Sequence, residues 1–216
     1  MAEDSVLTVA ETRAYDAAAI ARGISGMVLM EHAAAAAAEV LLELGATGPI
    51  GILCGKGNNG GDGLVMTRRL RERGIAGTLI LAEPPDRFRG DAAEAWRRLG
   101  NSQASVFDDD AATLIDRLQC CEWLVDALLG TGFTGIPRSP YDVLIRTLNA
   151  AGRPILAVDV PSGLDADLGT APGEAVRATA TVTFVGMKIG FLQPAAAAFT
   201  GQVFVRPILG GLQICG

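Results

Sequence analysis

The sequence predicts an α/β protein in which a mostly parallel sheet lies between two layers of helices. From residue 50 onward, apolar segments without polar alternation are separated by amphipathic segments. This pattern is typical of parallel strands that are buried on both faces and joined by helices. Four of the apolar segments are followed by glycine-rich or charged residues. Because such sheets bind ligands at the carboxyl ends of their strands, these four segments are the first candidates for a site.

Two helical segments precede the predicted sheet. Thr8 and a glutamate three residues later have the spacing of a capping box, which predicts a helix over residues 8–22. Ser25 is in place to cap a second helix that runs to Gly45. A run of alanines at 33–38 lies inside this second helix, and we interpret it as a packing surface because small side chains let another element approach closely.

Strands and helices alternate along the rest of the chain. The predicted strands cover residues 50–54, 77–82, 122–129, 155–160, 180–186 and 202–206. The predicted helices lie near residues 61–73, 90–99, 109–118 and 140–151. No internal repeat, low-complexity linker or break in composition divides them. We therefore expect residues 1–216 to form a single domain with an N-terminal helical extension.

Composition and charge argue against several classes of protein. The 216 residues are half apolar and carry a formal net charge of −6, so disorder is not expected. The main basic cluster, at residues 68–73, fits the solvated face of a helix better than a nucleic-acid surface. The chain has no apolar stretch of about 20 residues that predicts a membrane span, and its acidic start lacks the basic region of a signal peptide. We expect a cytoplasmic protein without nucleic-acid or membrane partners.

The cysteines and the single histidine do not predict a zinc site or a disulfide framework. Cys54, Cys120, Cys121 and Cys215 show no C-x-x-C spacing, and His32 is the only histidine. We expect the cysteines to be buried free thiols.

The segment GKGNNGGDG, residues 55–63, follows the first strand of the predicted sheet and is the most unusual in the chain. It contains the dinucleotide-binding pattern G-x-G-x-x-G, and Glu83 lies near the end of the next strand, where NAD enzymes place a ribose-binding acid. An NAD-dependent dehydrogenase is therefore one interpretation. A Walker A loop is excluded because Gly57, and not Ser or Thr, follows Lys56. The structural alternative is a tight turn with Asp62 near the positive end of a helix.

Oxygen-bearing side chains lie near the ends of other predicted strands. Asp126 and Asp159 each come at the end of an apolar stretch, and Ser162 follows Asp159 across a proline. Together with the amide of Asn59 they offer hard ligands, which suit an alkali or alkaline-earth cation and not zinc. Capping of turns is the alternative for the two aspartates. Ser162 lacks the G-x-S-x-G context of a serine hydrolase.

Two further segments have the chemistry of a phosphate site. Residues 130–135, GTGFTG, can direct several backbone N–H groups at a phosphate, with a tight turn as the alternative. Lys188 follows a predicted strand, where it is a candidate to bind a phosphate or to act in proton transfer. A solvated lysine is the structural alternative there.

Five segments carry a resemblance to a known family. They read LTVAETRAYDAAAIARGISGMVLMEHA, GKGNNGGDGLV, VDALLGTGFTG, VDVPSGLDAD and TVTFVGMKIGF, and they begin at residues 7, 55, 125, 158 and 181. In this order they resemble the NAD(P)H-hydrate epimerase family, also called the YjeF N-terminal domain, over nearly the whole chain. The resemblance implies a Rossmann-like three-layer α/β/α sandwich. It also implies interconversion of the R and S forms of hydrated NADH and NADPH (NADHX and NADPHX), so that a dehydratase can act on the S form.

The resemblance also implies the residues of the site. The implied substrate-binding residues are Asn58, Asn59, Gly60, Gly61, Asp62, Gly130, Thr131, Gly132, Phe133, Thr134, Gly135, Ile136 and Asp159. The implied ligands of a potassium ion are Asn59, Asp126 and Ser162. We expect Asp159 to transfer a proton during epimerisation at C6, with Lys188 as the second candidate. The glycines are expected to allow close approach of the substrate pyrophosphate, and Asp62 to mark the start of a helix.

Some features depart from the family or stay open. The family usually has MENAG where this chain has MEHAA at residues 30–34, so His32 either joins the proton chemistry or only packs. Members of the family commonly form dimers, and we expect a homodimer. The family is often fused to a dehydratase, so a dehydratase domain or partner is one possibility, and whether the chain is a piece of a longer protein stays open. The alternative function is a non-catalytic nucleotide-binding or scaffold protein on the same fold.

Overall fold

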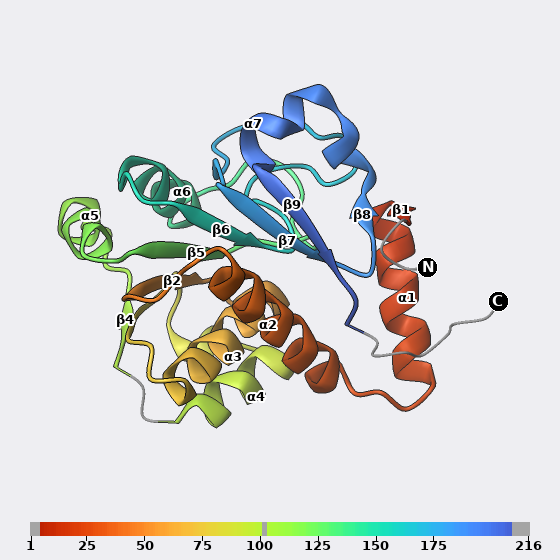
Figure 1. Cartoon of the computed structure of the whole chain (residues 1–216), viewed down its shortest axis with the longest axis horizontal. Helices are drawn as coiled ribbons and strands as arrows, with labels where there is room; N and C mark the ends of the chain where they lie inside the picture. The colour runs from red at the N-terminus through yellow and green to blue at the C-terminus, as the bar shows by residue number, and fades with distance from the viewer. Residues whose placement is uncertain (1–4, 101–102, 209–216) are drawn as a thin grey trace.

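The computed structural model describes residues 5–100 and 103–208, and its centre is a seven-stranded sheet (Figure 1). The strands lie in the order β4-β3-β2-β5-β6-β7-β9, and every neighbouring pair is parallel. They are β2 (Ile50–Cys54), β3 (Gly77–Leu81), β4 (Ala104–Val106), β5 (Trp123–Ala127), β6 (Ile155–Val158), β7 (Ala180–Phe184) and β9 (Gln202–Arg206). The predicted α/β class with a mostly parallel sheet is confirmed.

Helices cover both faces of this sheet. Figure 1 shows α2, α3 and α4 on one face and α5 and α6 on the other. The helices are α1 (Val9–Ala21), α2 (Gly26–Glu43), α3 (Asn58–Glu72), α4 (Gly90–Leu99), α5 (Ala111–Gln119), α6 (Tyr141–Ala150) and α7 (Ala197–Thr200), with 3-10 turns at Pro85–Arg87, Ile189–Leu192 and Pro194–Ala196. Each layer packs its apolar residues on the sheet and forms a separate buried cluster. The result is the three-layer α/β/α sandwich that the sequence predicts.

The central strands lack polar alternation because both of their faces are covered. Every residue of β2, β5, β6 and β7 is buried, as expected for strands inside a parallel sheet. The alanine run serves the same packing: Ala34, Ala37 and Ala38 have no exposed surface, and α2 packs closely on α3.

The N-terminal segment is joined to the sheet domain and is not a free extension. Strand β1 (Val6–Leu7) pairs in parallel with β8 (Met187–Lys188), which follows β7. The predicted capping box is present: the Thr8 hydroxyl accepts from the backbone N–H of Glu11, and the Glu11 carboxylate accepts from that of Thr8. Ser25 caps α2 with its side chain, as expected. These bonds fix where α1 and α2 begin.

Some expected boundaries are wrong. Helix α3 begins at Asn58 and not near residue 61, so the asparagines and glycines of NNGG form its first turn and Asp62 lies beyond its start. The short strands β1, β4 and β8 were not expected, because two or three residues show no periodic pattern. Strands β5 and β6 end sooner than expected, and Asp159 therefore lies just beyond the sheet.

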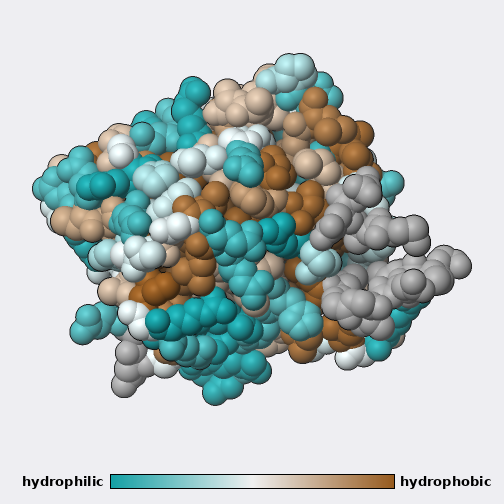
Figure 2. Space-filling view, viewed as in Figure 1, coloured by the Kyte–Doolittle hydropathy of each residue, from teal (hydrophilic) through white to brown (hydrophobic). Residues whose placement is uncertain are grey.

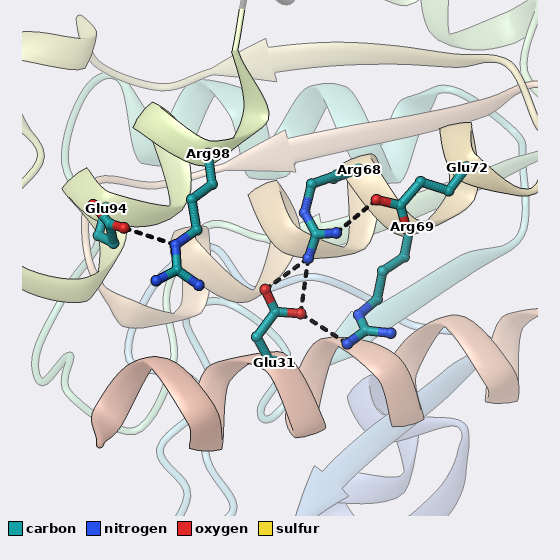
Figure 3. Close-up of polar contacts among 6 residues, drawn as sticks. All are labelled: Glu31, Arg68, Arg69, Glu72, Glu94 and Arg98. Atoms are coloured by element: carbon teal, nitrogen blue, oxygen red, sulfur yellow. Dashed lines mark hydrogen bonds and ion pairs between the residues drawn. The ribbon is translucent and has the colours of Figure 1, made fainter.

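Two arginines of the basic cluster at 68–73, Arg68 and Arg69, are paired with acidic side chains. Glu31 of α2 binds Arg68 at 2.6 Å and Arg69 at 2.7 Å, and Arg68 also binds Glu72 on its own helix (Figure 3). Figure 2 shows hydrophilic residues gathered over α3 and α4. These arginines thus join α2 to α3 at the surface, which agrees with the interpretation of the cluster as an outer helix face.

The described cysteines are free, and their burial differs. Cys54 and Cys121 are buried, but Cys120 is exposed at the end of α5, so the expectation of a buried thiol is wrong for Cys120. Cys215 lies outside the described residues. Within the described ranges, no group of three or more histidine, cysteine, aspartate or glutamate side chains is arranged to hold a metal ion. None of the described helices combines the length and the apolar character needed to cross a bilayer.

Candidate active site

The strand order reverses between β2 and β5, and a cavity opens at this point. Strands β3 and β4 lie on one side of the pair, and β6, β7 and β9 lie on the other. Open parallel sheets bind ligands at such a switch point, beyond the carboxyl ends of the strands. The cavity has a volume of about 670 Å³, and its walls come from the segments after β2, β5, β6 and β7 and from α1, α2 and the start of α4.

The N-terminus of α3 opens into this cavity. Its N-cap is Gly57, which has no side chain to accept the free backbone N–H groups of the first turn. Gly57, Asn58 and Asn59 all line the cavity. The positive end of the helix dipole and the free N–H groups suit this wall to an anion such as a phosphate.

Two glycines of the first turn serve packing inside the protein. A Cβ atom on Gly60 would overlap the backbone oxygen of Gly55, and one on Gly61 would overlap the side chain of Met30. Neither glycine lines the cavity. A Cβ on Gly57, by contrast, would meet no atom within 4 Å. Gly60 and Gly61 therefore allow α3 to lie close to its own preceding loop and to α2. The sequence pattern does not distinguish this role from that of leaving room for a ligand.

The side chain of Asn59 is buried without a hydrogen-bond partner among the described residues. Only 8% of the residue is exposed, and neither its Oδ1 nor its Nδ2 is paired. A buried polar group left unpaired destabilises a fold, so such a group points to a ligand, ion or water. Asn59 lies against Gly130 of the loop after β5, where an added Cβ would come within 3.2 Å of the Asn59 Cβ.

Asp126 and Ser162 form a fully buried hydrogen-bonded pair next to the same loop. Ser162 donates from its hydroxyl to Asp126 Oδ1 at 2.6 Å and from its backbone N–H to Oδ2 at 2.8 Å. The Ser162 hydroxyl oxygen accepts from the backbone N–H of Leu129 at 2.8 Å. Burial raises the pKa of Asp126 to about 6, against the lowering effect of the hydrogen bonds from Ser162 and Leu128. A cation close by would favour the charged carboxylate.

Asp159 faces the cavity and is held by a buried lysine. Lys188 has no exposed surface, and its Nζ lies 3.2 Å from Asp159 Oδ1 and donates to the Phe184 carbonyl oxygen at 3.0 Å. Asp159 Oδ2 accepts from the Thr131 N–H at 3.3 Å. Asp159 and Val185, both on the cavity wall, have φ angles of 66° and 69°. Such angles are sparsely populated outside glycine and cluster at functional sites.

Asp62 and Asp16 bring two more carboxyl groups to the cavity. Burial raises the pKa of Asp62 well above its usual value, and the nearby carboxylates of Asp159 and Asp16 raise it further. Burial also raises the pKa of Asp16; Asp159 adds to this effect and Lys188 opposes it. The two neighbouring carboxylates thus add to the effect of burial, and the neutral form of Asp62 is favoured.

Sequence reasoning did not find Asp16. It lies on α1, and the pattern of a helix does not say which end of a sheet the helix covers. Two contacts place it: β1 pairs with β8, and Arg13 of α1 donates to the Thr131 carbonyl oxygen at 3.0 Å. These contacts bring α1 across the opening of the cavity, where Thr12, Arg13 and Asp16 line its wall.

The predicted site residues take three kinds of position. The residues that line the cavity are Asn58, Asn59, Asp62, Gly130, Thr131, Gly132, Phe133 and Asp159. The residues that line a second, adjoining cavity of about 730 Å³ are Phe133, Thr134, Gly135 and Ile136. The residues that line neither cavity are Gly60, Gly61, Asp126, Ser162 and Lys188. Lys188 therefore contacts a ligand in the cavity only through Asp159.

His32 holds the segment that follows β9. Its Nδ1 lies 2.6 Å from the carbonyl oxygen of Ile208, and Ile208 lines the cavity, whereas His32 does not. Of the two roles left open for His32, proton chemistry and packing, this geometry fits packing.

Replacing Asp62 by asparagine is expected to stabilise the folded protein at neutral pH. The folded state raises the pKa of Asp62, so the protonated group favours folding fully below the unfolded pKa of about 3.9, and this contribution is lost as the pH rises toward the folded pKa. Asparagine stays neutral and avoids the loss. The urea midpoint of Asp62→Asn should exceed that of the unaltered protein at about pH 8, and the difference should shrink toward about pH 4.

The matched control is Asp116→Asn, at an exposed position on α5. It should show no comparable pH-dependent gain. An Asp62→Asn variant that is less stable than the unaltered protein at about pH 8 would contradict the assignment of an unfavourable buried charge at this position.

Comparison with known proteins matches most of the chain to one family. Residues 26–190 match the family described as YjeF-related protein N-terminus. The chain is 38% identical over 203 residues to the NAD(P)H-hydrate epimerase of Pirellula staleyi, a match that covers 92% of this chain and 89% of that protein. It is 39% identical over 196 residues to the bifunctional NAD(P)H-hydrate repair enzyme Nnr of Coxiella burnetii. That match covers 90% of this chain but spans only 39% of the relative.

A solved structure supports the fold. The crystal structure of a yeast protein superposes with a TM-score of 0.78 and covers 94% of this chain and 88% of its own. The two sequences are 22% identical, so this likeness bears on the fold alone. It agrees with the three-layer arrangement of the sheet and helices.

Proposed function

This chain belongs to the YjeF-related protein N-terminus family, and we propose that it is an NAD(P)H-hydrate epimerase, an isomerase that interconverts the R and S forms of NADHX and NADPHX. One arrangement above all supports this function. The open N-terminus of α3 and Asp159 face the same cavity, and Lys188 lies behind Asp159 and pairs with it. The helix N-terminus suits the pyrophosphate of a dinucleotide. The aspartate supplies an acid–base group beside it.

The reaction takes place at C6 of the hydrated nicotinamide ring, and it conserves both protons and electrons. The hydroxyl group takes up a proton and leaves as water, and a water molecule adds to the other face and gives up a proton. Asp159, which is paired with Lys188, is suited to accept a proton, and Asp62, whose pKa is raised by burial and by Asp159 and Asp16, is suited to donate one. No hydride is transferred, which separates this activity from that of the dehydrogenase suggested by the G-x-G-x-x-G pattern.

We further propose that Asn59, Asp126 and Ser162 hold a potassium ion. The support is their chemistry: a buried carboxylate, a buried hydroxyl and a buried amide whose oxygen has no partner among the described residues. Oxygen donors of this kind suit an alkali cation. The ion would offset the negative charge of Asp126. Asn59 would then link the first turn of α3 to the loop after β5, the two segments that form the cavity wall.

The test starts from the purified R form of NADHX and follows the S form by chromatography. The protein should accelerate the interconversion beyond the spontaneous rate, and more strongly in potassium buffer than in sodium buffer. The variant Asn59→Leu removes the unpaired amide while keeping the branched shape and the number of non-hydrogen atoms, so the difference between the two buffers should shrink. A folded protein that gives no acceleration in either buffer would overturn the epimerase and favour a non-catalytic nucleotide-binding role. Equal acceleration in both buffers would overturn the potassium site alone.

A dehydratase that consumes the S form is the partner that this reaction calls for. The bifunctional name of the Coxiella burnetii relative supports such a partner or domain. The homodimer and the cytoplasmic location stay predictions from the sequence.

A further inference from the structure

The second cavity contains a hydrogen-bonded cluster that the proposed proton transfer does not use. Glu83 follows β3, and its carboxylate lies 2.8 Å from the Nζ of Lys56. The hydroxyl of Tyr141, at the start of α6, donates to the same carboxylate at 2.8 Å. The Glu83 side chain is 19% exposed, and all three residues line the cavity. A fixed carboxylate with part of its surface open to a cavity is a ready hydrogen-bond acceptor for a ligand.

The cluster keeps Glu83 ionised. Burial by itself would raise its pKa, but the hydrogen bonds from Lys56 and Tyr141 and the positive charges of Lys56 and Arg87 outweigh burial and lower the pKa. Burial and the hydrogen bond to Glu83 raise the pKa of Tyr141, so it remains a phenol that donates to the carboxylate. Both partners hold the carboxylate in one position.

The two cavities adjoin each other in an order that fits a dinucleotide. They share Lys56, Phe133 and Tyr141 on their walls. Along the sheet, β3 leads toward Glu83, β2 leads into the N-terminus of α3, and β6 leads into Asp159. Strands β3 and β6 are three strand spacings apart, or about 14 Å at about 4.8 Å per spacing. A helix N-terminus that binds a pyrophosphate thus lies between an acid–base group and a second carboxylate.

The walls of the second cavity suit a flat base. Phe107, which follows β4, and Phe133 of the loop after β5 both line it. Aromatic side chains provide apolar faces for a purine ring. The position of Glu83 after the strand next to β2 is also where dinucleotide-binding folds place a carboxylate that accepts from ribose hydroxyls.

We propose that the second cavity binds the adenosine half of the substrate and that Glu83 selects hydrated NADH over hydrated NADPH. This inference rests on the proposed epimerase function. The Glu83 carboxylate accepts hydrogen bonds from the ribose hydroxyls of NADHX, whereas the 2′-phosphate of NADPHX brings a second negative charge against it. Lys56 is engaged by Glu83. Arg138, which also lines the cavity, is exposed, and its charge is screened by water and salt.

The test compares kcat/KM for NADHX and NADPHX in the unaltered protein and in Glu83→Gln. A charge-assisted hydrogen bond and the repulsion of a phosphate together predict a preference for NADHX of at least about tenfold. Glu83→Gln should lower kcat/KM for NADHX about tenfold, mainly through KM, and should narrow the preference. Tyr141→Phe, which removes one support of the carboxylate, should act in the same direction with a smaller effect.

Glu122→Gln is the matched control. Glu122 accepts from the backbone N–H of Thr47 at 3.1 Å before the start of β5, at the opposite end of the strands, and lines neither cavity. It should leave the preference between the two substrates unchanged. Thermal unfolding of all three variants checks that they are folded.

Binding of NADH and NADPH, measured by calorimetry, separates this inference from the proposed function because it needs no turnover. Tighter binding of NADH, weakened by Glu83→Gln, supports the adenosine site even if no epimerisation is found. Epimerisation with equal kcat/KM for the two substrates would overturn the role of Glu83 but not the epimerase function. A preference for NADPHX would do the same and would assign the 2′-phosphate to Arg138. A protein that binds neither NADH nor NADPH and shows no turnover would overturn both this inference and the proposed function.

Discussion

Replacing Gly60 by alanine is expected to destabilise the protein by about 3 kcal/mol and to abolish epimerase activity. The new Cβ would overlap the backbone oxygen of Gly55, which cannot rotate away as a side chain does. The first turn of α3 and the loop after β2 would have to separate. This movement would displace Asn59 and the free N–H groups of the helix start, so activity should fall by more than the loss of folded protein explains. Urea unfolding and the chromatographic assay at a temperature where the variant is folded measure the two effects.

Gly57→Ala is the control for stability, because a Cβ there would meet no atom within 4 Å and the backbone is extended, with φ of −90°. It should change the free energy of unfolding by less than about 1 kcal/mol. If Gly60→Ala proves as stable as Gly57→Ala, the close contact between Gly60 and Gly55 does not govern the geometry of this turn.

The glycine-rich turn at residues 55–63 shows which features the sequence predicts and which it does not. Its position after a buried strand was sufficient to place it at the carboxyl edge of the sheet, where the cavity lies, because the carboxyl ends of parallel strands meet at one edge. The pattern of letters did not reveal that α3 begins at Asn58 or that Gly60 and Gly61 pack against protein. Glycine is used equally for approach to a ligand and for approach to another part of the chain, and only the fold distinguishes the two.

The site residues also differ in whether their positions could be predicted from the sequence. Asp126 and Asp159 come at strand ends, so their approach to one edge follows from the topology. The contact between Asp126 and Ser162 also follows, because β5 and β6 are neighbours. Asp16 lies on α1, whose position depends on contacts far away in sequence, and no local pattern identifies it. The burial of Lys188 behind Asp159 is likewise a tertiary property, since a lysine after a strand is more often solvated.

Replacing Asp159 by asparagine is expected to lower kcat by about 10²- to 10⁴-fold with a much smaller change in KM, because the variant loses the proposed proton acceptor and keeps the shape of the cavity. It also leaves Lys188 charged, buried and without its counter-ion. Breaking a buried ion pair on one side costs about 3–5 kcal/mol, so some loss of activity in the single variant could come from unfolding. Steady-state kinetics therefore need to be paired with a stability measurement.

A double variant separates the two causes. In D159N/K188M both charges are removed, and a buried ion pair replaced by uncharged groups of similar volume often leaves stability unchanged or higher. The double variant should therefore recover the free energy of unfolding lost in D159N, while kcat stays low, because the proton acceptor is still missing. Recovery of turnover together with stability would show that Asp159 serves the fold and not the reaction. The proton transfer would then have to be assigned to the remaining carboxyl groups that line the cavity, Asp16, Asp62 and Asp91.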